Sequence, residues 1–133
     1  MNTPSLNHVA ITVSDLEKSA EFYQNVLGLK LLEIRPEKSA MLGDGHVGLL
    51  GMLLSPNVLV SGIDHFGFTF LDSEFFRDYT QKIKSELSAR GITYEEKAHH
   101  DKSRSLFFRD PNGYKLQLVY LPPDYFEIGR AHV

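Results

Sequence analysis

Two histidines stand at the same position of a repeated octet, and their surroundings could hold a ligand. With an offset of 57 residues, the octet His8–Asp15 aligns with His65–Asp72, and a histidine, a threonine and an aspartate coincide. Side chains alternate between the two faces of a strand, so each histidine shares its face with a small residue, Ala10 or Gly67. Small residues beside a polar side chain leave room for a bound molecule. We therefore expect both histidines to line a pocket, together with the threonines of the two octets.

A third ligand is expected on the last predicted strand. Alternation along that strand places Lys115 and Gln117 on the pocket side. Two imidazoles and an amide oxygen suit a borderline divalent ion and leave positions open for water or substrate. We therefore predict a metal site at His8, His65 and Gln117 that holds Fe, Mn, Ni or Zn.

The repeat also predicts the elements that must position these residues. A helical pattern follows each octet, begins at an aspartate and ends at a glycine, Gly28 or Gly91. A strand follows each helix, and two more strands are joined by a tight turn, at Gly43–Gly45 in the first copy and Asp110–Gly113 in the second. The order βαβββ therefore occurs twice, and we predict an α+β fold of two tandem βαβββ modules, forming a curved mixed sheet around a pocket.

Periodicity separates the expected core from the expected surface. The helical aromatic residues predicted to be in the core are Phe22, Tyr23, Phe75 and Phe76. Three further histidines stand in polar turns, where we expect solvent exposure or a place at the pocket mouth. They are His46, His99 and His100.

The bulk composition is that of one small globular domain. The chain has 133 residues, is 42% hydrophobic and 23% charged, and carries a formal net charge of −3, which gives no basic surface for nucleic acid. The absence of cysteine excludes disulfides and thiolate metal sites. We expect a single domain over residues 1–127, with modules at about 6–55 and 63–121. Residues 128–133 match a translated sequencing adapter and are expected to be non-native.

The N-terminus shows no leader pattern and no apolar run approaches the roughly 18 residues of a membrane span. We therefore expect a cytoplasmic protein without a membrane partner.

The motifs resemble those of the vicinal-oxygen-chelate superfamily, which includes glyoxalases, bleomycin resistance proteins and extradiol dioxygenases. The resemblance extends over residues 6–121 and rests on the segments Asn7–Leu16, Phe22–Leu29, Asp64–His65 and Phe108–Gln117. In metal-dependent members, two such histidines and a carboxylate four residues after the turn glycine bind the metal. The resemblance therefore implies His8, His65 and position 117 as ligands, although position 117 is glutamine where these families usually have glutamate.

The resemblance also implies contacts with a substrate and with a second subunit. Superfamily residues flanking the seventh strand often contact anionic substrate groups, and Arg104, Ser105 and Arg109 occupy those positions here; ordinary surface charge is the alternative. Tyr94 is a similar candidate on a second strand. The complete predicted set of substrate-binding residues is Thr12, Thr69, Tyr94, Arg104, Ser105 and Lys115. Superfamily members of this length commonly pair, so we expect a homodimer.

Two functions remain open from the sequence. One is a metal-dependent lyase or dioxygenase, of glyoxalase or extradiol type, in which the ion chelates adjacent oxygens of a small substrate as a Lewis acid. The other is a metal-free protein that sequesters a drug or metabolite, as bleomycin resistance proteins do. The histidine pair favours the enzyme. Aligning Gly45 with Gly113 places Leu49 opposite Gln117, so a fourth ligand is missing and a three-ligand site is expected, as in extradiol dioxygenases and fosfomycin-resistance enzymes.

Overall fold

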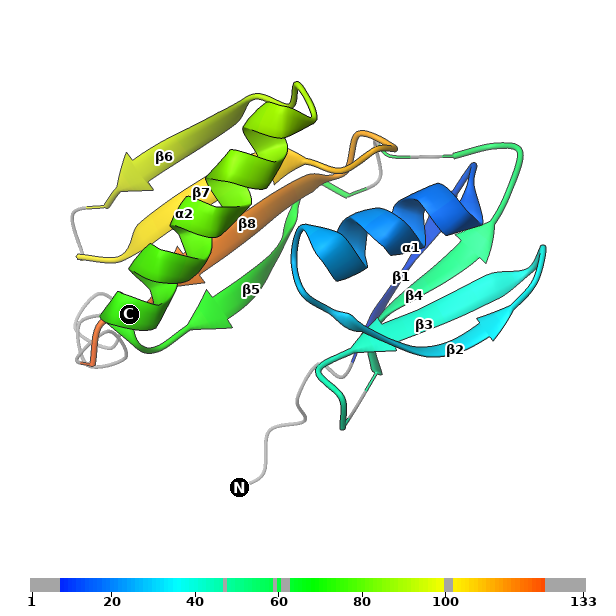
Figure 1. Ribbon diagram of the computed structural model, residues 1–133, viewed down its shortest axis with the longest axis horizontal. Helices are drawn as coiled ribbons and strands as arrows, with labels where there is room; N and C mark the ends of the chain where they lie inside the picture. Colours follow the sequence, from blue (N-terminus) through cyan, green and yellow to red (C-terminus); the bar gives the residue numbers. More distant parts are fainter. Residues whose placement is uncertain (1–7, 47, 59, 61–62, 100–101, 124–133) are drawn as a thin grey trace. The chain divides into compact units, whose positions relative to one another are not determined.

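The computed structural model describes residues 8–46, 48–58, 60, 63–99 and 102–123. The chain divides into two compact units, Met1–Gly62 and Ile63–Val133, which we call module 1 and module 2. In its described part, each module has the predicted element order βαβββ (Figure 1), and the predicted α+β fold is confirmed. The predicted adapter tail and His100 lie outside the described residues.

Both modules have the same strand order. Module 1 consists of β1 (Val9–Val13), α1 (Leu16–Asn25), β2 (Lys30–Arg35), β3 (Ser39–Gly43) and β4 (Gly48–Leu54). Its sheet has the order β1-β4-β3-β2, in which β1 and β4 are parallel and the other pairs are antiparallel.

Module 2 repeats this arrangement with a longer helix. It consists of β5 (Phe66–Phe70), α2 (Ser73–Ala89), β6 (Tyr94–Ala98), β7 (Arg104–Arg109) and β8 (Lys115–Tyr120). Its sheet has the order β5-β8-β7-β6, again with only the outer pair β5 and β8 parallel. Neither described helix is long and apolar enough to cross a bilayer.

The predicted helix ends are confirmed in both copies. The Asp15 carboxylate accepts a hydrogen bond from the backbone N–H of Lys18 at 3.0 Å, and that of Asp72 accepts one from Phe75 at 2.9 Å. Each aspartate thus satisfies a backbone donor that the first helical turn leaves unpaired. At the other end, Gly28 and Gly91 have φ angles of 78° and 72°, a left-handed conformation that side chains disfavour.

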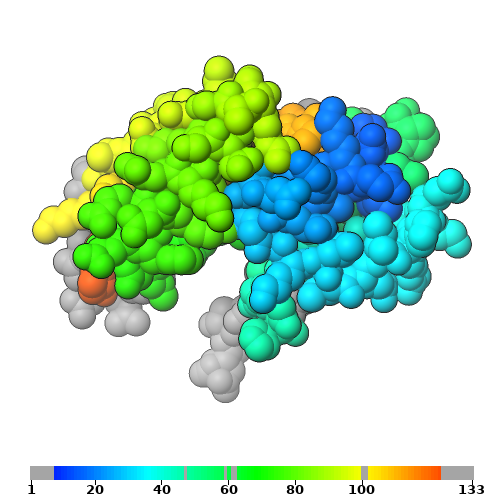
Figure 2. Space-filling view, viewed as in Figure 1, coloured from blue at the N-terminus to red at the C-terminus, as the bar shows by residue number. Residues whose placement is uncertain are grey.

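Each helix lies over one face of its own sheet (Figure 1). In module 2, α2 buries one side chain per turn along a single stripe, and from the side shown in Figure 2 its green side chains cover the strands behind it. The buried side chains of this stripe are Phe76, Thr80, Ile83 and Leu87. On the sheet, the alternate residues Leu106, Leu116 and Leu118 are fully buried.

The prediction that all four helical aromatic residues lie in the core is wrong for one of them. Phe22, Tyr23 and Phe76 are buried, but the Phe75 side chain is 56% exposed. Successive helical residues point about 100° apart, and the buried stripe of α2 passes through Phe76, which leaves Phe75 at its side. Phe75 instead lies beside the rings of Phe70 and Tyr79, with centroid distances of 5.8 and 5.3 Å.

Candidate functional site

Most of the predicted site residues of module 2 gather on the face of its sheet that points away from α2. Leu116 and Leu118 are buried on the α2 side, so Gln117 between them points the other way. Strand pairing sets Gln117 beside Gly67 of β5 and Phe107 of β7. We call this the distal face, and by alternation its members are His65, Gly67, Thr69, Ser105, Phe107, Arg109, Lys115, Gln117 and Val119.

His65 stands immediately before β5 and is held by its neighbour in the chain. Its Nδ1 lies 2.6 Å from the Asp64 carboxylate, and its ring meets the Phe107 ring edge to face at a centroid distance of 6.3 Å. Because Nδ1 is bound to the carboxylate, Nε2 is the ring nitrogen left to bind a metal. A carboxylate behind a histidine is the usual support of a metal ligand.

The surroundings of Asp64 keep this carboxylate ionised. The hydrogen bond and the charge of His65 lower the pKa of Asp64 below its usual value, and the nearby positive charges of Lys115 and Arg109 lower it further. An ionised Asp64 can accept the Nδ1 proton of His65 over the whole neutral range.

Gln117 belongs to a chain of side-chain hydrogen bonds. Its Nε2 donates to Ser105 Oγ at 2.9 Å, and Ser105 Oγ in turn lies 3.0 Å from His99 Nε2. The Ser105 side chain is buried, and His99 is half-buried. The expectation that His99 is solvent exposed is therefore wrong, because the pairing of β6 with β7 continues into its turn, where His99 N–H donates to the Ser103 carbonyl at 2.9 Å. His46 is exposed, as predicted.

Gly67 leaves the space between His65 and Gln117 without a side chain. A Cβ added to Gly67 would lie 2.9 Å from the Gln117 carbonyl oxygen and 3.4 Å from its Cβ. The parallel strands β5 and β8 thus approach closely at this pair. A larger residue at position 67 would fill the part of the distal face that lies between the two predicted ligands.

Lys115 and Phe107 border a cavity at the end of the distal face. The Lys115 Nζ lies 4.9 Å from the centroid of the Phe107 ring, which also contacts the His65 ring. The cavity measures about 360 Å³, and Glu95 and Arg109 also line it. Thr69, which pairs with Val119, is exposed on the same face.

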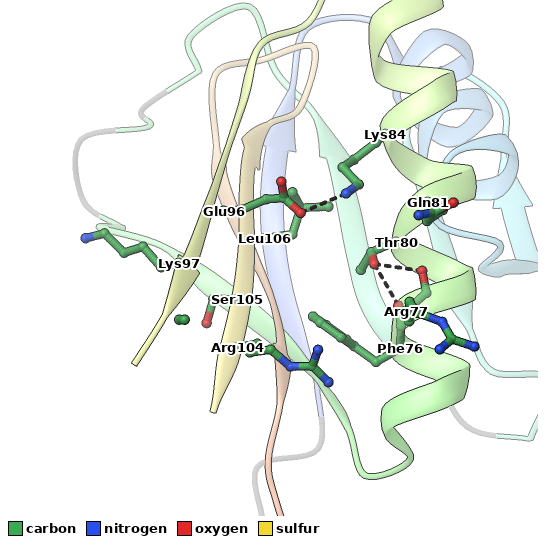
Figure 3. A pocket seen from close by; sticks show the side chains of 11 residues that line it. Phe76, Arg77, Thr80, Gln81, Lys84, Glu96, Lys97, Arg104, Ser105 and Leu106 are labelled. Atoms are coloured by element: carbon green, nitrogen blue, oxygen red, sulfur yellow. Dashed lines mark hydrogen bonds and ion pairs between the residues drawn. The ribbon is translucent and has the colours of Figure 1, made fainter. Parts of the chain in front are cut away.

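Arg104 and Tyr94 are not brought together with Gln117. Arg104 Cζ lies 5.8 Å from the Phe76 ring and 5.1 Å from the Tyr120 ring, on the α2 side of the sheet. Figure 3 shows the guanidinium group beside Phe76, in a cavity of about 340 Å³ between α2 and the strands β6 and β7. Tyr94 pairs with buried Phe108 and so also points to the α2 side, although it borders the cavity at Lys115.

In module 1, His8 stands immediately before β1, as His65 stands before β5. Ile11 and Val13 of β1 are buried, which leaves His8, Ala10 and Thr12 on the other face.

Strand register corrects the alignment of the two copies. Gly67 pairs with Gln117, and the equivalent residue Ala10 pairs with Gly51. The counterpart of Gln117 is therefore Gly51 and not Leu49. Gly51 stands six positions after Gly45, whereas Gln117 stands four positions after Gly113, and the pairing of β3 with β4 shifts at its end, which the alignment of turn glycines could not reveal. A fourth ligand is still missing, because glycine has no side chain.

The donor set is neutral and nitrogen-rich. Within the described ranges, no group of three or more His, Cys, Asp or Glu side chains could hold a metal ion. The predicted set has only two ligands of these types, and its third ligand is an amide. Such donors fit a borderline divalent transition metal better than a hard cation such as Mg²⁺ or Ca²⁺.

Comparison with known proteins identifies the family. A family model described as Glyoxalase/Bleomycin resistance protein/Dioxygenase superfamily matches residues 5–118. The chain belongs to this superfamily. The resemblance seen in its motifs is thereby confirmed.

Sequence relatives and a solved structure agree with this assignment. The chain is 31% identical over 125 residues to a "Metallothiol transferase FosB" of Lysinibacillus sphaericus, covering 88% of this chain and 82% of the relative. It is 31% identical over 118 residues to a "Glutathione transferase FosA" of Serratia marcescens, covering 86% and 79%. The fosfomycin resistance protein FosX of Listeria monocytogenes has the same fold, with a TM-score of 0.71, 19% identity, and coverage of 93% and 98%. The two sequence relatives are transferases by name.

Two contributors to the site were missed in the sequence. The first is Asp64, and its adjacency to His65 is the signal in the sequence for a carboxylate that supports a ligand. The second is His99, for which the sequence offers no signal, because nothing in a run of polar residues reveals which one turns back toward the sheet.

Proposed function

We propose that this member of the superfamily is a metal-dependent enzyme that joins a thiol to a small oxygen-bearing electrophile. The proposed ligands of its divalent transition metal are His8, His65 and Gln117. The observation that carries it is the support of His65 by Asp64 at 2.6 Å, which leaves Nε2 on the distal face that also bears Gln117. The names of the two sequence relatives support the transferase class.

The bound ion would supply Lewis acidity to an oxygen of the electrophile. The ligand residues hold the ion, and Gly67 leaves room for substrate between two of them. In the proposed reaction, the thiolate sulfur forms a bond to an electrophilic carbon and the carbon–oxygen bond breaks. The released oxygen then takes a proton from water, so that atoms and charge balance.

Gln117 favours thiol addition over the lyase reaction considered from the sequence. An isomerising lyase needs a base that removes a proton from carbon, and an amide is not a useful proton acceptor. A thiol ionises to a few per cent at neutral pH without help, so its addition needs no protein base at position 117.

The cavity at Lys115 supports a substrate with an anionic group. Lys115 and Arg109 bring two positive charges to the lining of this cavity. The Phe107 ring also lines it and contacts the His65 ring. Glu95 opposes these charges on β6. Phosphonates and carboxylates are therefore the first electrophiles to test, with fosfomycin as the probe and glutathione as the thiol.

Metal analysis of the purified protein tests the proposal. Protein prepared without chelators should contain about one transition-metal ion per chain, and His65→Ala should lose it. His46→Ala is the matched control, because His46 is an exposed histidine in a turn. If the wild-type protein contains no metal, and His65→Ala binds small ligands as well as the wild type does, the sequestering alternative is supported and the enzyme proposal is overturned.

A thiol-consumption assay with fosfomycin and glutathione tests the reaction itself. Activity should need added metal after chelation and should vanish in His65→Ala. Metal-loaded protein that consumes no thiol with any phosphonate or carboxylate epoxide would refute the transfer reaction while leaving the metal site intact.

The homodimer stays a prediction, which sedimentation equilibrium checks.

A further inference from the structure

Glutamine as a metal ligand poses a problem that glutamate does not. The two oxygens of a carboxylate are equivalent, so either can bind an ion. The two ends of an amide differ, because the oxygen accepts and the NH₂ group only donates. If the NH₂ end of Gln117 faced the ion, it would offer hydrogens where a lone pair is required. A site built on Gln117 therefore needs a feature that fixes the orientation of the amide.

Ser105 supplies a contact that distinguishes the two ends. Its Oγ lies 2.9 Å from Gln117 Nε2, which can only donate, so the hydroxyl oxygen accepts. The hydroxyl proton then needs its own acceptor, and His99 Nε2 lies 3.0 Å away. When His99 carries its proton on Nδ1, its Nε2 accepts, and the order is amide N–H to hydroxyl, then hydroxyl O–H to the ring nitrogen. With Nε2 held in this way, Oε1 is the end of the amide that remains for an ion.

Burial makes this contact selective. The Ser105 side chain is only 3% exposed, so water does not readily replace a lost partner there. His99 is held at the start of a turn by two backbone hydrogen bonds, from its own N–H to Ser103 and from Lys102 to its carbonyl, at 2.9 and 3.0 Å. The acceptor for the Ser105 hydroxyl is therefore positioned by the fold itself.

We propose that Ser105, supported by His99, is a positioning residue that directs the Oε1 end of Gln117 toward the metal. This inference rests on the metal site proposed above and adds to it the reason that a glutamine can serve there. It also assigns to Ser105, which the sequence predicts as a substrate contact, the role of supporting a metal ligand instead.

Cobalt titration of the chelator-treated protein tests the role. Ser105→Ala should weaken Co²⁺ binding by about tenfold, the lower end of what loss of a ligand's hydrogen-bond partner costs. Ser105→Thr keeps the hydroxyl and should restore most of the affinity. Thr80→Val is the matched control: it removes another buried hydroxyl, one that donates to the Phe76 carbonyl at 2.7 Å on the α2 side, and should leave Co²⁺ affinity unchanged.

A double-mutant cycle separates orientation from general disruption. In a Gln117→Glu background the ligand has two equivalent oxygens, so Ser105→Ala should change Co²⁺ affinity by less than about threefold. An equal loss in both backgrounds would show that Ser105 acts in some other way and would overturn the inference. If Ser105→Ala does not fold, His99→Phe removes the acceptor instead and should weaken Co²⁺ binding in the Gln117 protein alone.

Side-chain NMR gives a readout that needs no metal. In metal-free protein, the ¹⁵N and ¹H resonances of the Gln117 NH₂ group should shift in Ser105→Ala toward those of a solvated amide and stay fixed in Thr80→Val. Unshifted resonances, or Co²⁺ bound equally well by Ser105→Ala, would overturn this inference and leave the metal site standing. Wild-type protein that binds no Co²⁺ would overturn both.

Discussion

Replacing Gly67 by alanine tests how closely the two central strands of module 2 approach. The added Cβ would lie 2.9 Å from the Gln117 carbonyl oxygen. Close carbon–oxygen contacts between strands are about 3.3 Å, so the two strands must separate by roughly 0.4 Å at this pair. The obstructing atom belongs to the backbone of β8 and cannot rotate away. We expect Gly67→Ala to lower the free energy of unfolding by about 1–3 kcal/mol, the usual cost of overpacking.

Module 1 provides the matched control within the same chain. Gly51 lies on β4 opposite Ala10, in the strand pair that corresponds to β5 and β8. A Cβ at Gly51 would meet Ala10 Cβ at 3.5 Å and Met41 Cε at 3.6 Å, which are ordinary contacts. Gly51→Ala should therefore change stability by no more than about 0.5 kcal/mol.

Urea unfolding at neutral pH measures both variants. The midpoint should fall for Gly67→Ala and stay near the wild-type value for Gly51→Ala, with similar slopes. Because the displaced carbonyl is that of Gln117, Gly67→Ala should also weaken Co²⁺ binding. Equal stability of the two variants would refute the close approach of β5 and β8.

Three further predictions follow from individual side chains. Burial raises the pKa of Tyr79, so as the pH rises the unfolded chain loses this proton before the folded protein does. The free energy of unfolding should therefore fall as the pH rises above the ordinary value of 10.0, and Tyr79→Phe should reduce that fall in urea titrations. Asp64→Ala should weaken Co²⁺ binding about tenfold by freeing the His65 ring, and unchanged affinity would refute its supporting role. Asp72→Ala should cost about 1 kcal/mol of stability by removing the cap of α2, and thermal unfolding should show a smaller loss for Asp72→Asn.

The fold could be predicted because its signals are local and occur twice. Asp15 and Asp72 cap helices through contacts three residues away, and Gly28 and Gly91 end them through their own backbone angles. The two faces of β8 follow from the alternation of side chains. The burial pattern of the strand confirms the predicted direction of Gln117. Such features need no knowledge of distant parts of the chain.

The remaining features depend on tertiary contacts. Gly51 could not be matched to Gln117, because the length of a turn and a shift in strand register are not visible as residue types. The role of His99 depends on a hydrogen bond to Ser105, which pairing of β6 with β7 brings within reach. The contacts of Arg104 with the Phe76 and Tyr120 rings on the α2 side likewise depend on packing that residue types do not show, and its role as a substrate contact stays a prediction.

Met41 limits the side chains that module 1 can carry at the position equivalent to Gln117. Its side chain lies against Gly51, where its Cε would be 3.6 Å from an added Cβ, and against Gly48, where its Sδ would be only 2.7 Å away. A long acidic side chain at position 51 would therefore compete with Met41 for the same volume. A larger residue at position 51 would therefore require the Met41 side chain to move aside, whereas position 117 already carries a long polar side chain. The two copies of the repeat thus differ in what they can hold at equivalent positions, and a change of ligand type is open to position 117 without any rearrangement around position 51.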